Sequence, residues 1–212
     1  MNKVKEETLD IFDDKGQWIG TEARSEVHRL GLWHQTFHCW IYRREKERVY
    51  LLFQKRHPQK DTSPNKLDIT SAGHLLAGEG PRDGVRELEE ELGLAVSYES
   101  LQHIGVIRDV SGEPGIVDRE ICHVYGYESD QPLEAYQIQQ EELTGLLWIR
   151  LDELMRLLNG EISSVRASGF VCDEDGSVSG VSQEVGMADL VAHEKSYYQT
   201  VFKAIRKLAD TS

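Results

Sequence analysis

The chain has 212 residues, of which 39% are hydrophobic, enough for one large globular domain or a domain with an extension. Its formal net charge of −13 argues against a general affinity for nucleic acid polymers or anionic membranes, because both need basic surfaces. No apolar run reaches the roughly 20 residues that span a bilayer, and the N-terminal residues lack the apolar core of a signal peptide. The cysteines Cys39, Cys122 and Cys172 are widely spaced, which favours free thiols in a reducing cytoplasm. We therefore expect a cytoplasmic protein.

Apolar segments alternate with turn residues along the first three quarters of the chain. A β-hairpin is predicted from residues 8–12 and 17–21, with Asp-Lys-Gly in the turn. Further strands are predicted at residues 37–42, 49–55, 101–109, 120–127 and 146–149, with a loop over 43–48. Residues 67–72 are predicted to form a short strand or an extended segment. Helices are predicted at residues 81–92 and 151–158. Interleaved strands and helices favour a layered α/β domain.

The last part of the chain differs in composition. Residues 159–186 are rich in Gly, Ser and Asp and are predicted to form a loop. Residues 187–209 are predicted to form an amphipathic helix, because their apolar side chains lie close to one face. We expect this face to pack on the same domain, and a homodimer contact is the alternative. The organisation predicted is a domain over residues 1–158, with the loop and helix of residues 159–212 packed on it.

The most informative stretch is residues 73–94. Pro81 suits the first turn of its helix and Gly93 suits the end, while Gly84 indicates close packing. Glu87, Glu90 and Glu91 are spaced i, i+3 and i+4, so they share one helical face. Such a face repels itself unless a cation neutralises it, and Mg²⁺ is the usual choice where a substrate phosphate completes the shell, with Mn²⁺ as the alternative. The spacing alone would also suit an ordinary solvated acidic face.

The whole stretch resembles the Nudix box, Gly-x5-Glu-x7-Arg-Glu-U-x-Glu-Glu-x-Gly-U, where U is a bulky aliphatic residue. The fixed positions are filled by Gly73, Glu79, Arg86, Glu87, Leu88, Glu90, Glu91, Gly93 and Leu94. One departure is that six residues, not seven, separate Glu79 from Arg86. The shortening leaves the role of Glu79 open but does not touch the carboxylate face of the helix.

The resemblance implies a Nudix-type α/β/α sandwich with a mixed central sheet and, here, a C-terminal helical extension. It implies hydrolysis of a phosphoanhydride bond in a small diphosphate-containing substrate. Glu87, Glu90 and Glu91 would hold the metal and Arg86 would orient them, while the Gly73 carbonyl would be a further metal ligand at the substrate-binding site. The base that accepts the proton of the attacking water would be one of these carboxylates or Glu120, and the sequence does not choose between them.

Outside the box, residues 8–158 are similar to the Nudix subgroup that includes isopentenyl-diphosphate isomerase. Arg56 and Lys60 lie in a segment similar to its diphosphate-binding segment, and their alternative is a solvated basic loop. Glu120 lies in a segment similar to an acidic tripeptide that helps to hold metal. His34 and His74 are candidates to bind metal or phosphate, and a structural role is their alternative.

The isomerase uses a cysteine that the resemblance would place near Ser71, and none of the three cysteines lies there. We therefore favour a hydrolase. The isomerase and a non-catalytic sensor that binds diphosphates are the alternatives.

Overall fold

The structure is a computed structural model that describes residues 6–60, 62–113, 116–173 and 175–211. The strands are β1 (Thr8–Phe12), β2 (Trp18–Ala23), β3 (Trp33–Glu45), β4 (Arg48–Arg56), β5 (Leu67–Asp68), β6 (Ser71–His74), β7 (Gln102–Glu113), β8 (Ile116–Glu128), β9 (Leu143–Arg150), β10 (Val165–Cys172) and β11 (Val178–Val185). The helices are α1 (Arg24–Leu30), α2 (Arg86–Leu92), α3 (Leu151–Leu158) and α4 (Lys195–Thr211), with 3-10 turns at Asp83–Val85, Tyr98–Ser100, Leu133–Ala135 and Met187–Asp189.

The strands form one mixed sheet whose main path runs β11-β10-β9-β4-β3-β1-β2. The central strand β3 pairs in antiparallel fashion with β1, β4 and β6 and in parallel with β8. The strand β8 continues the sheet on the other side of β3 by pairing with β7. The predicted strands are present, except that residues 67–72 divide between β5, which pairs with β4, and β6, which pairs with β3. The predicted loop over residues 43–48 shortens to a tight turn between β3 and β4.

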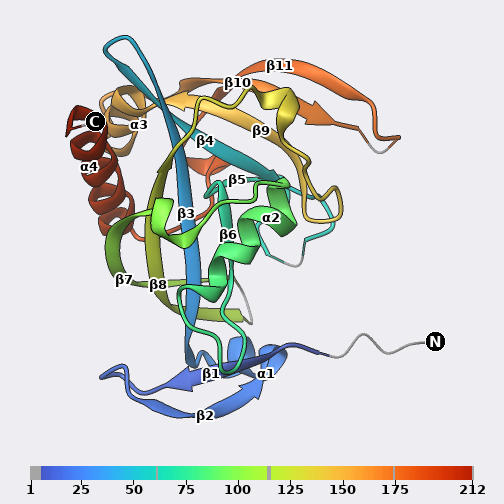
Figure 1. The fold of residues 1–212 in the computed structure, drawn as a ribbon, viewed down its shortest axis with the longest axis vertical. Helices are drawn as coiled ribbons and strands as arrows, with labels where there is room; N and C mark the ends of the chain where they lie inside the picture. Colours follow the sequence, from blue (N-terminus) through green and yellow to red (C-terminus); the bar gives the residue numbers. More distant parts are fainter. Residues whose placement is uncertain (1–5, 61, 114–115, 174, 212) are drawn as a thin grey trace.

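Side chains that alternate along β3 enter two different cores, because successive residues of a strand face opposite sides of the sheet. Phe37 and Ile41 pack in one apolar cluster with Leu88 of α2. Trp40 and Tyr42 pack in a second cluster with the apolar faces of α3 and α4. Figure 1 shows α2 on one side of β3 and the pair α3 and α4 on the other. This arrangement confirms the predicted α/β/α sandwich.

The motif helix is shorter than predicted. A 3-10 turn over Asp83–Val85 precedes α2, which begins at Arg86 and ends at Leu92. Gly93 then takes the left-handed conformation, with φ of 64°, as its predicted place at the end of the helix requires. A Cβ on Gly84 would lie 2.5 Å from the Cβ of Phe37, so this glycine allows the turn to pack directly on β3.

Residues 159–186 were predicted as a loop, and this prediction is wrong. They contain β10 and β11, an antiparallel hairpin, and β10 pairs with β9, so the sheet continues past residue 158. A Cβ on Gly169 would lie 1.9 Å from the carbonyl oxygen of Leu146, and one on Gly145 would lie 2.4 Å from that of Phe170. The glycines therefore serve a close approach of two strands, whereas composition alone indicated a loop.

The C-terminal helix also begins later than predicted. Residues 187–194 form a 3-10 turn and an extended connection, and α4 begins at Lys195. Tyr197, Val201 and Ile205 are buried against the sheet, while Met187, which was assigned to the apolar face, is 41% exposed. Within the described residues, every helix is too short or too polar to cross a bilayer.

Candidate active site

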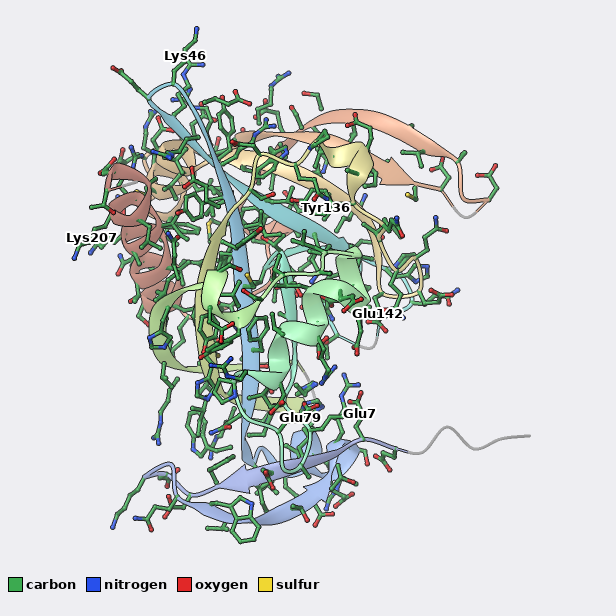
Figure 2. The ribbon with its side chains drawn as sticks, viewed as in Figure 1. Glu7, Lys46, Glu79, Tyr136, Glu142 and Lys207 are labelled. Atoms are coloured by element: carbon green, nitrogen blue, oxygen red, sulfur yellow. The ribbon has the colours of Figure 1, made fainter. Side chains whose placement is uncertain are left out.

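A cleft of about 1280 Å³ is lined by residues of α1, α2, β3, β6 and β8 and of the connections before β5, β9 and α4. Figure 2 shows Glu7 and Glu142, which both line the cleft, on the side of the molecule on which α2 lies. The predicted site residues that line it are Arg56, Lys60, Gly73, His74, Arg86, Glu87, Glu90, Glu91 and Glu120. The structure therefore brings together residues that lie more than 60 positions apart in the sequence. His34 is fully buried beneath this lining.

The floor of the cleft follows from strand register. His34, Thr36 and His38 occupy the face of β3 that continues into the apolar core further along the strand. Glu120 of β8 lies opposite His34, and Asp109 of β7 lies opposite Glu120, so all three belong to one row on the same face. One face of the sheet is thus polar at the cleft and apolar beyond it.

Arg86 orients three carboxylates. Its Nε and Nη2 atoms donate to the two oxygens of Glu79, both at 3.1 Å, and its Nη1 atom donates to Glu90 at 2.9 Å. The same Nη1 atom lies 2.7 Å from Glu87, and Nη2 also donates to the carbonyl oxygen of His74 at 3.0 Å. Glu79 therefore holds Arg86 in spite of the shortened spacing, which assigns Glu79 a positioning role.

Gly73 provides the space in which the Glu87 carboxylate lies. A Cβ on Gly73 would lie 2.2 Å from the Cδ atom of Glu87. Burial raises the pKa of Glu87 to about 7, against the opposing charge of Arg86. Glu91 accepts the Ala72 amide at 3.2 Å, and its burial together with the charge of Glu87 raises its pKa to about 8. Both carboxylates are thus held where negative charge is costly without a cation.

A second group of donors consists of three imidazoles and one carboxylate. The rings of His28, His34 and His74 have centroids 5.1 to 5.3 Å apart. The Nε2 atom of His34 and the Oδ1 atom of Asp118 lie 3.3 Å apart, yet neither is hydrogen-bonded to any described residue. Burial lowers the pKa of all three histidines, which favours the neutral form that binds metal. We call His28, His34, His74 and Asp118 the histidine group.

Sequence reasoning did not assign a role to His28 or to Asp118 by itself. His28 lies on α1, a helix that was not predicted. The six-residue spacing between His28 and His34 does not indicate that they lie close together, because a turn at Gly31 places them in different elements, α1 and β3. Asp118 was noted only as part of the tripeptide that contains Glu120. The parallel pairing of β3 with β8 brings it beside His34.

Glu120 lies next to the histidine group. Its Oε2 atom is 3.6 Å from the Nε2 atom of His38 and 3.6 Å from the Sγ atom of Cys122. Burial, reinforced by the charge of Asp118, raises the pKa of Glu120 to about 8. The position agrees with a carboxylate that holds metal or accepts a proton, the two roles expected of it.

Arg56 and Lys60 line the cleft but also contact protein carboxylates. Arg56 donates from Nη1 to Asp68 at 2.8 Å and from Nε and Nη2 to the carbonyl oxygen of Thr62. Lys60 is paired with Glu142. Burial lowers the pKa of Lys60, and the nearby charge of Arg56 adds to this effect. These two cations are therefore fixed in place at the cleft and are not part of a freely solvated loop.

The donor set fits a divalent metal ion. Among the described residues, ten Asp and Glu but only six Lys and Arg line the cleft. The buried carboxyls Glu87, Glu91 and Glu120 all have raised pKa values, as expected of carboxyls whose negative charge is not fully neutralised by the protein. Carboxylate oxygens suit Mg²⁺ or Mn²⁺, and the imidazoles of the histidine group suit transition metals.

The sheet flanked by helices, with a carboxylate helix over a cleft, defines a Nudix domain. The protein-family model described as the NUDIX domain matches residues 32–168 of the sequence. The chain belongs to the Nudix hydrolase family, the pyrophosphohydrolases, whose members typically use divalent metals.

Known proteins resemble the chain over most of its length. An uncharacterized Nudix hydrolase of Clostridium acetobutylicum is 44% identical over 202 residues, which cover 95% of this chain and 98% of that protein. An isopentenyl-diphosphate Delta-isomerase of Corynebacterium diphtheriae is 30% identical over 166 residues, which cover 75% of this chain and 86% of that one. A crystal structure from Deinococcus radiodurans is similar in fold, with a TM-score of 0.54, 18% identity and coverage of 73% and 90%.

The raised pKa values predict how the metal-free protein responds to pH. A carboxyl whose folded pKa exceeds its unfolded value binds more protons in the folded state, so its contribution to stability is lost as pH rises from about 5 to about 8. Glu91, with a folded pKa of about 8, should behave in this way. In EDTA, Glu91→Gln should have a higher Tm than the wild type, and the difference should widen from pH 5.5 to pH 8. A difference that does not depend on pH would contradict the assignment.

The space at Gly73 predicts a separation of function from folding. In Gly73→Ala the new methyl group would displace the flexible end of Glu87, so the fold should persist while the metal site is disturbed. We expect the affinity for Mn²⁺, measured by calorimetry, to fall about 10- to 100-fold. Gly105→Ala is the control, because a Cβ there meets nothing within 4 Å. Unchanged Mn²⁺ affinity in Gly73→Ala would show that the position of Glu87 does not matter.

Proposed function

We propose that the protein is a Mg²⁺-dependent hydrolase that cleaves a phosphoanhydride bond in a small diphosphate-containing molecule, such as a nucleoside or sugar diphosphate. The observation that carries this proposal is the convergence of Glu87, Glu90 and Glu91 on one cleft that also contains Arg56 and Lys60. Carboxylates would hold a cation at one end of the diphosphate, and the two basic side chains would bind its oxygens. Mn²⁺ is the alternative cation.

The chain's own residues would divide the work. Arg86 sets the orientation of Glu87 and Glu90, and Glu79 sets that of Arg86. A divalent cation held by these carboxylates would supply positive charge that neutralises the diphosphate and makes a nearby water more acidic. Glu91 and Glu120 both line the cleft with pKa values near 8, so both remain candidates to accept the proton of that water.

The histidine group provides a second place for a cation. The unsatisfied Nε2 atom of His34 and Oδ1 atom of Asp118 support metal binding there, since buried polar atoms are seldom left without a partner. Three neutral imidazoles favour a transition metal over Mg²⁺. A metal at this place would lie beside Glu120, on the same sheet face as His38, and would help to balance the negative charge of the cleft.

The isomerase alternative lacks a thiol in the cleft. Ser71, near which the resemblance would place the cysteine, is fully buried beside Glu91. No cysteine is among the described residues that line the cleft. Cys122 contacts Glu120, but it is fully buried beneath the lining, and burial raises its pKa well above the ordinary value. A thiol in this state is a poor participant in proton transfer at the substrate.

Hydrolysis should depend on the carboxylates of α2. In a panel of nucleoside, sugar and coenzyme diphosphates with Mg²⁺, phosphate release and product masses would identify the best substrate. With that substrate, Glu91→Gln and Glu90→Gln should each lower kcat/KM by about 100-fold or more, because each removes a charge from the metal site. Glu89→Gln is the matched control, since Glu89 is exposed on the same helix and does not line the cleft. Wild-type rates in both site variants would show that the metal assignment is wrong.

Isopentenyl diphosphate should not be isomerised. The measurement is deuterium incorporation from deuterated water into isopentenyl diphosphate, together with formation of the dimethylallyl product, with Mg²⁺ present. We expect neither above background, because the described residues that line the cleft include no cysteine. Deuterium incorporation that is above background with the wild type and absent with Cys122→Ser would overturn the hydrolase proposal in favour of the isomerase.

A further inference from the structure

The connection before α4 is part of the cleft wall, although it lies outside residues 32–168, which match the family model. Val191, Ala192 and His193 line the cleft. Three hydrogen bonds hold the connection. The Val191 amide donates to the carbonyl oxygen of Leu67 at 2.9 Å, the Tyr198 hydroxyl donates to the carbonyl oxygen of Val191 at 2.8 Å, and the Glu194 amide donates to Oδ1 of Asp109 at 2.9 Å. The C-terminal segment therefore presents His193 to the cleft from a defined backbone.

His193 lies between two buried carboxylates. Its Nδ1 atom is 2.7 Å from the Oδ2 atom of Asp109, and its Nε2 atom is 3.6 Å from the Oδ1 atom of Asp68. The ring stacks on Tyr197, with centroids 4.7 Å apart and planes at 25°. The contact with Asp68 is an ion pair without a hydrogen bond. Burial opposes the charged form, but the hydrogen bond to Asp109 and the negative charges of Asp68 and Asp109 outweigh it and raise the pKa of His193 to about 10. The side chain is a buried cation at neutral pH.

Asp68 connects His193 to Arg56. The Oδ2 atom of Asp68 accepts from Nη1 of Arg56 at 2.8 Å, while its Oδ1 atom accepts the Ile69 amide at 2.8 Å and faces His193. A continuous chain of ion pairs therefore runs from Asp109 of β7 through His193 and Asp68 to Arg56 at the end of β4. The charges alternate in sign along it, so each side chain holds the next.

The bonding of Arg56 leaves it one donor for a ligand. A guanidinium has five N–H groups. Four bonds run from Arg56 to Asp68 and to the carbonyl and hydroxyl oxygens of Thr62. The remaining N–H, on Nη1, has no partner among the described residues, and Arg56 lines the cleft. The atom that donates to Asp68 is thus also the atom available to a phosphate oxygen.

We propose that His193 is a positioning residue for substrate binding: by holding Asp68, it fixes the Nη1 atom of Arg56 toward the diphosphate of the substrate. This inference rests on the proposed function, because it takes a diphosphate as the ligand of Arg56. A guanidinium that is already fixed loses less conformational entropy when the ligand binds, so the effect is on affinity. The C-terminal segment would then be required for substrate affinity although it lies beyond the matched domain.

A double-mutant cycle tests whether His193 acts through Asp68. The probe is methylenediphosphonate, an analogue of diphosphate whose bridging carbon prevents hydrolysis, titrated calorimetrically into the protein with Mg²⁺. We expect His193→Ala and Asp68→Asn each to weaken binding by about tenfold or more, since each removes one charge of a buried ion pair and leaves the other without it. The double variant should bind the probe about as weakly as the single variant with the lower affinity, because both substitutions act on Arg56 through the same chain of ion pairs. With the best substrate, KM should rise while kcat changes little.

Two further variants separate positioning from folding. Asp109→Asn keeps the shape of the chain but weakens its hold on His193, so it should weaken binding in the same direction, even if His193→Ala does not fold. Val201→Ala removes buried apolar contact from α4 without touching the chain, so it should lower Tm but leave the Kd for the probe unchanged.

The outcomes are distinct. Wild-type affinity in His193→Ala, or additive losses in the double variant, would overturn the positioning role while leaving the proposed function intact. A loss of affinity in Val201→Ala as large as that in His193→Ala would also overturn it, because His193 would then serve only to dock α4. No binding of methylenediphosphonate by the wild type would remove the proposed diphosphate site and this inference with it.

Discussion

The site depends on the cost of concentrating carboxylates in a partly buried cleft. Negative charges that are removed from water must be paired, protonated or bound to a cation. The protein pairs some of them: Arg86 holds Glu79, Glu87 and Glu90 at once. Glu91 and Glu120 are not neutralised in this way, and their pKa values are raised, so a divalent cation bound in the cleft would offset the remaining negative charge. Under the proposed function, the cost of these carboxylates would be largest in the metal-free protein and would fall when the metal binds.

Rigidity reaches the site from the central strand. The same face of β3 that presents His34 and His38 to the cleft presents Trp40 and Tyr42 to the core under α3 and α4. Tyr197 of α4 joins the two regions, because its hydroxyl contacts both His38, at 2.8 Å, and Trp40, at 3.2 Å. The C-terminal helix is therefore more than a cover for apolar surface, and its removal would free polar groups of the cleft as well as expose the core.

Local patterns predicted the elements that are determined by local interactions. The strands, α3 and the end of the motif helix at Gly93 were predictable because side-chain periodicity and capping act within a few residues. The hairpin of β10 and β11 was not, since Gly145 and Gly169 matter there for the approach of two strands, a contact that composition does not reveal. The start of α2 was also misplaced, because the 3-10 turn before it is set by the packing of Gly84 on Phe37.

The family resemblance, the α/β class and the carboxylates of the motif could be read from the amino-acid sequence, because Glu87, Glu90 and Glu91 need only helical geometry to converge. The distant groups that join them depend on how the chain folds. His28 comes from α1, Asp118 from a parallel neighbour of β3 and His193 from beyond the family-matched residues, and no local period relates these positions. Parallel pairing and the return of the C-terminal segment to the sheet place them in one cleft, and strand register and long-range packing are properties of the folded chain as a whole.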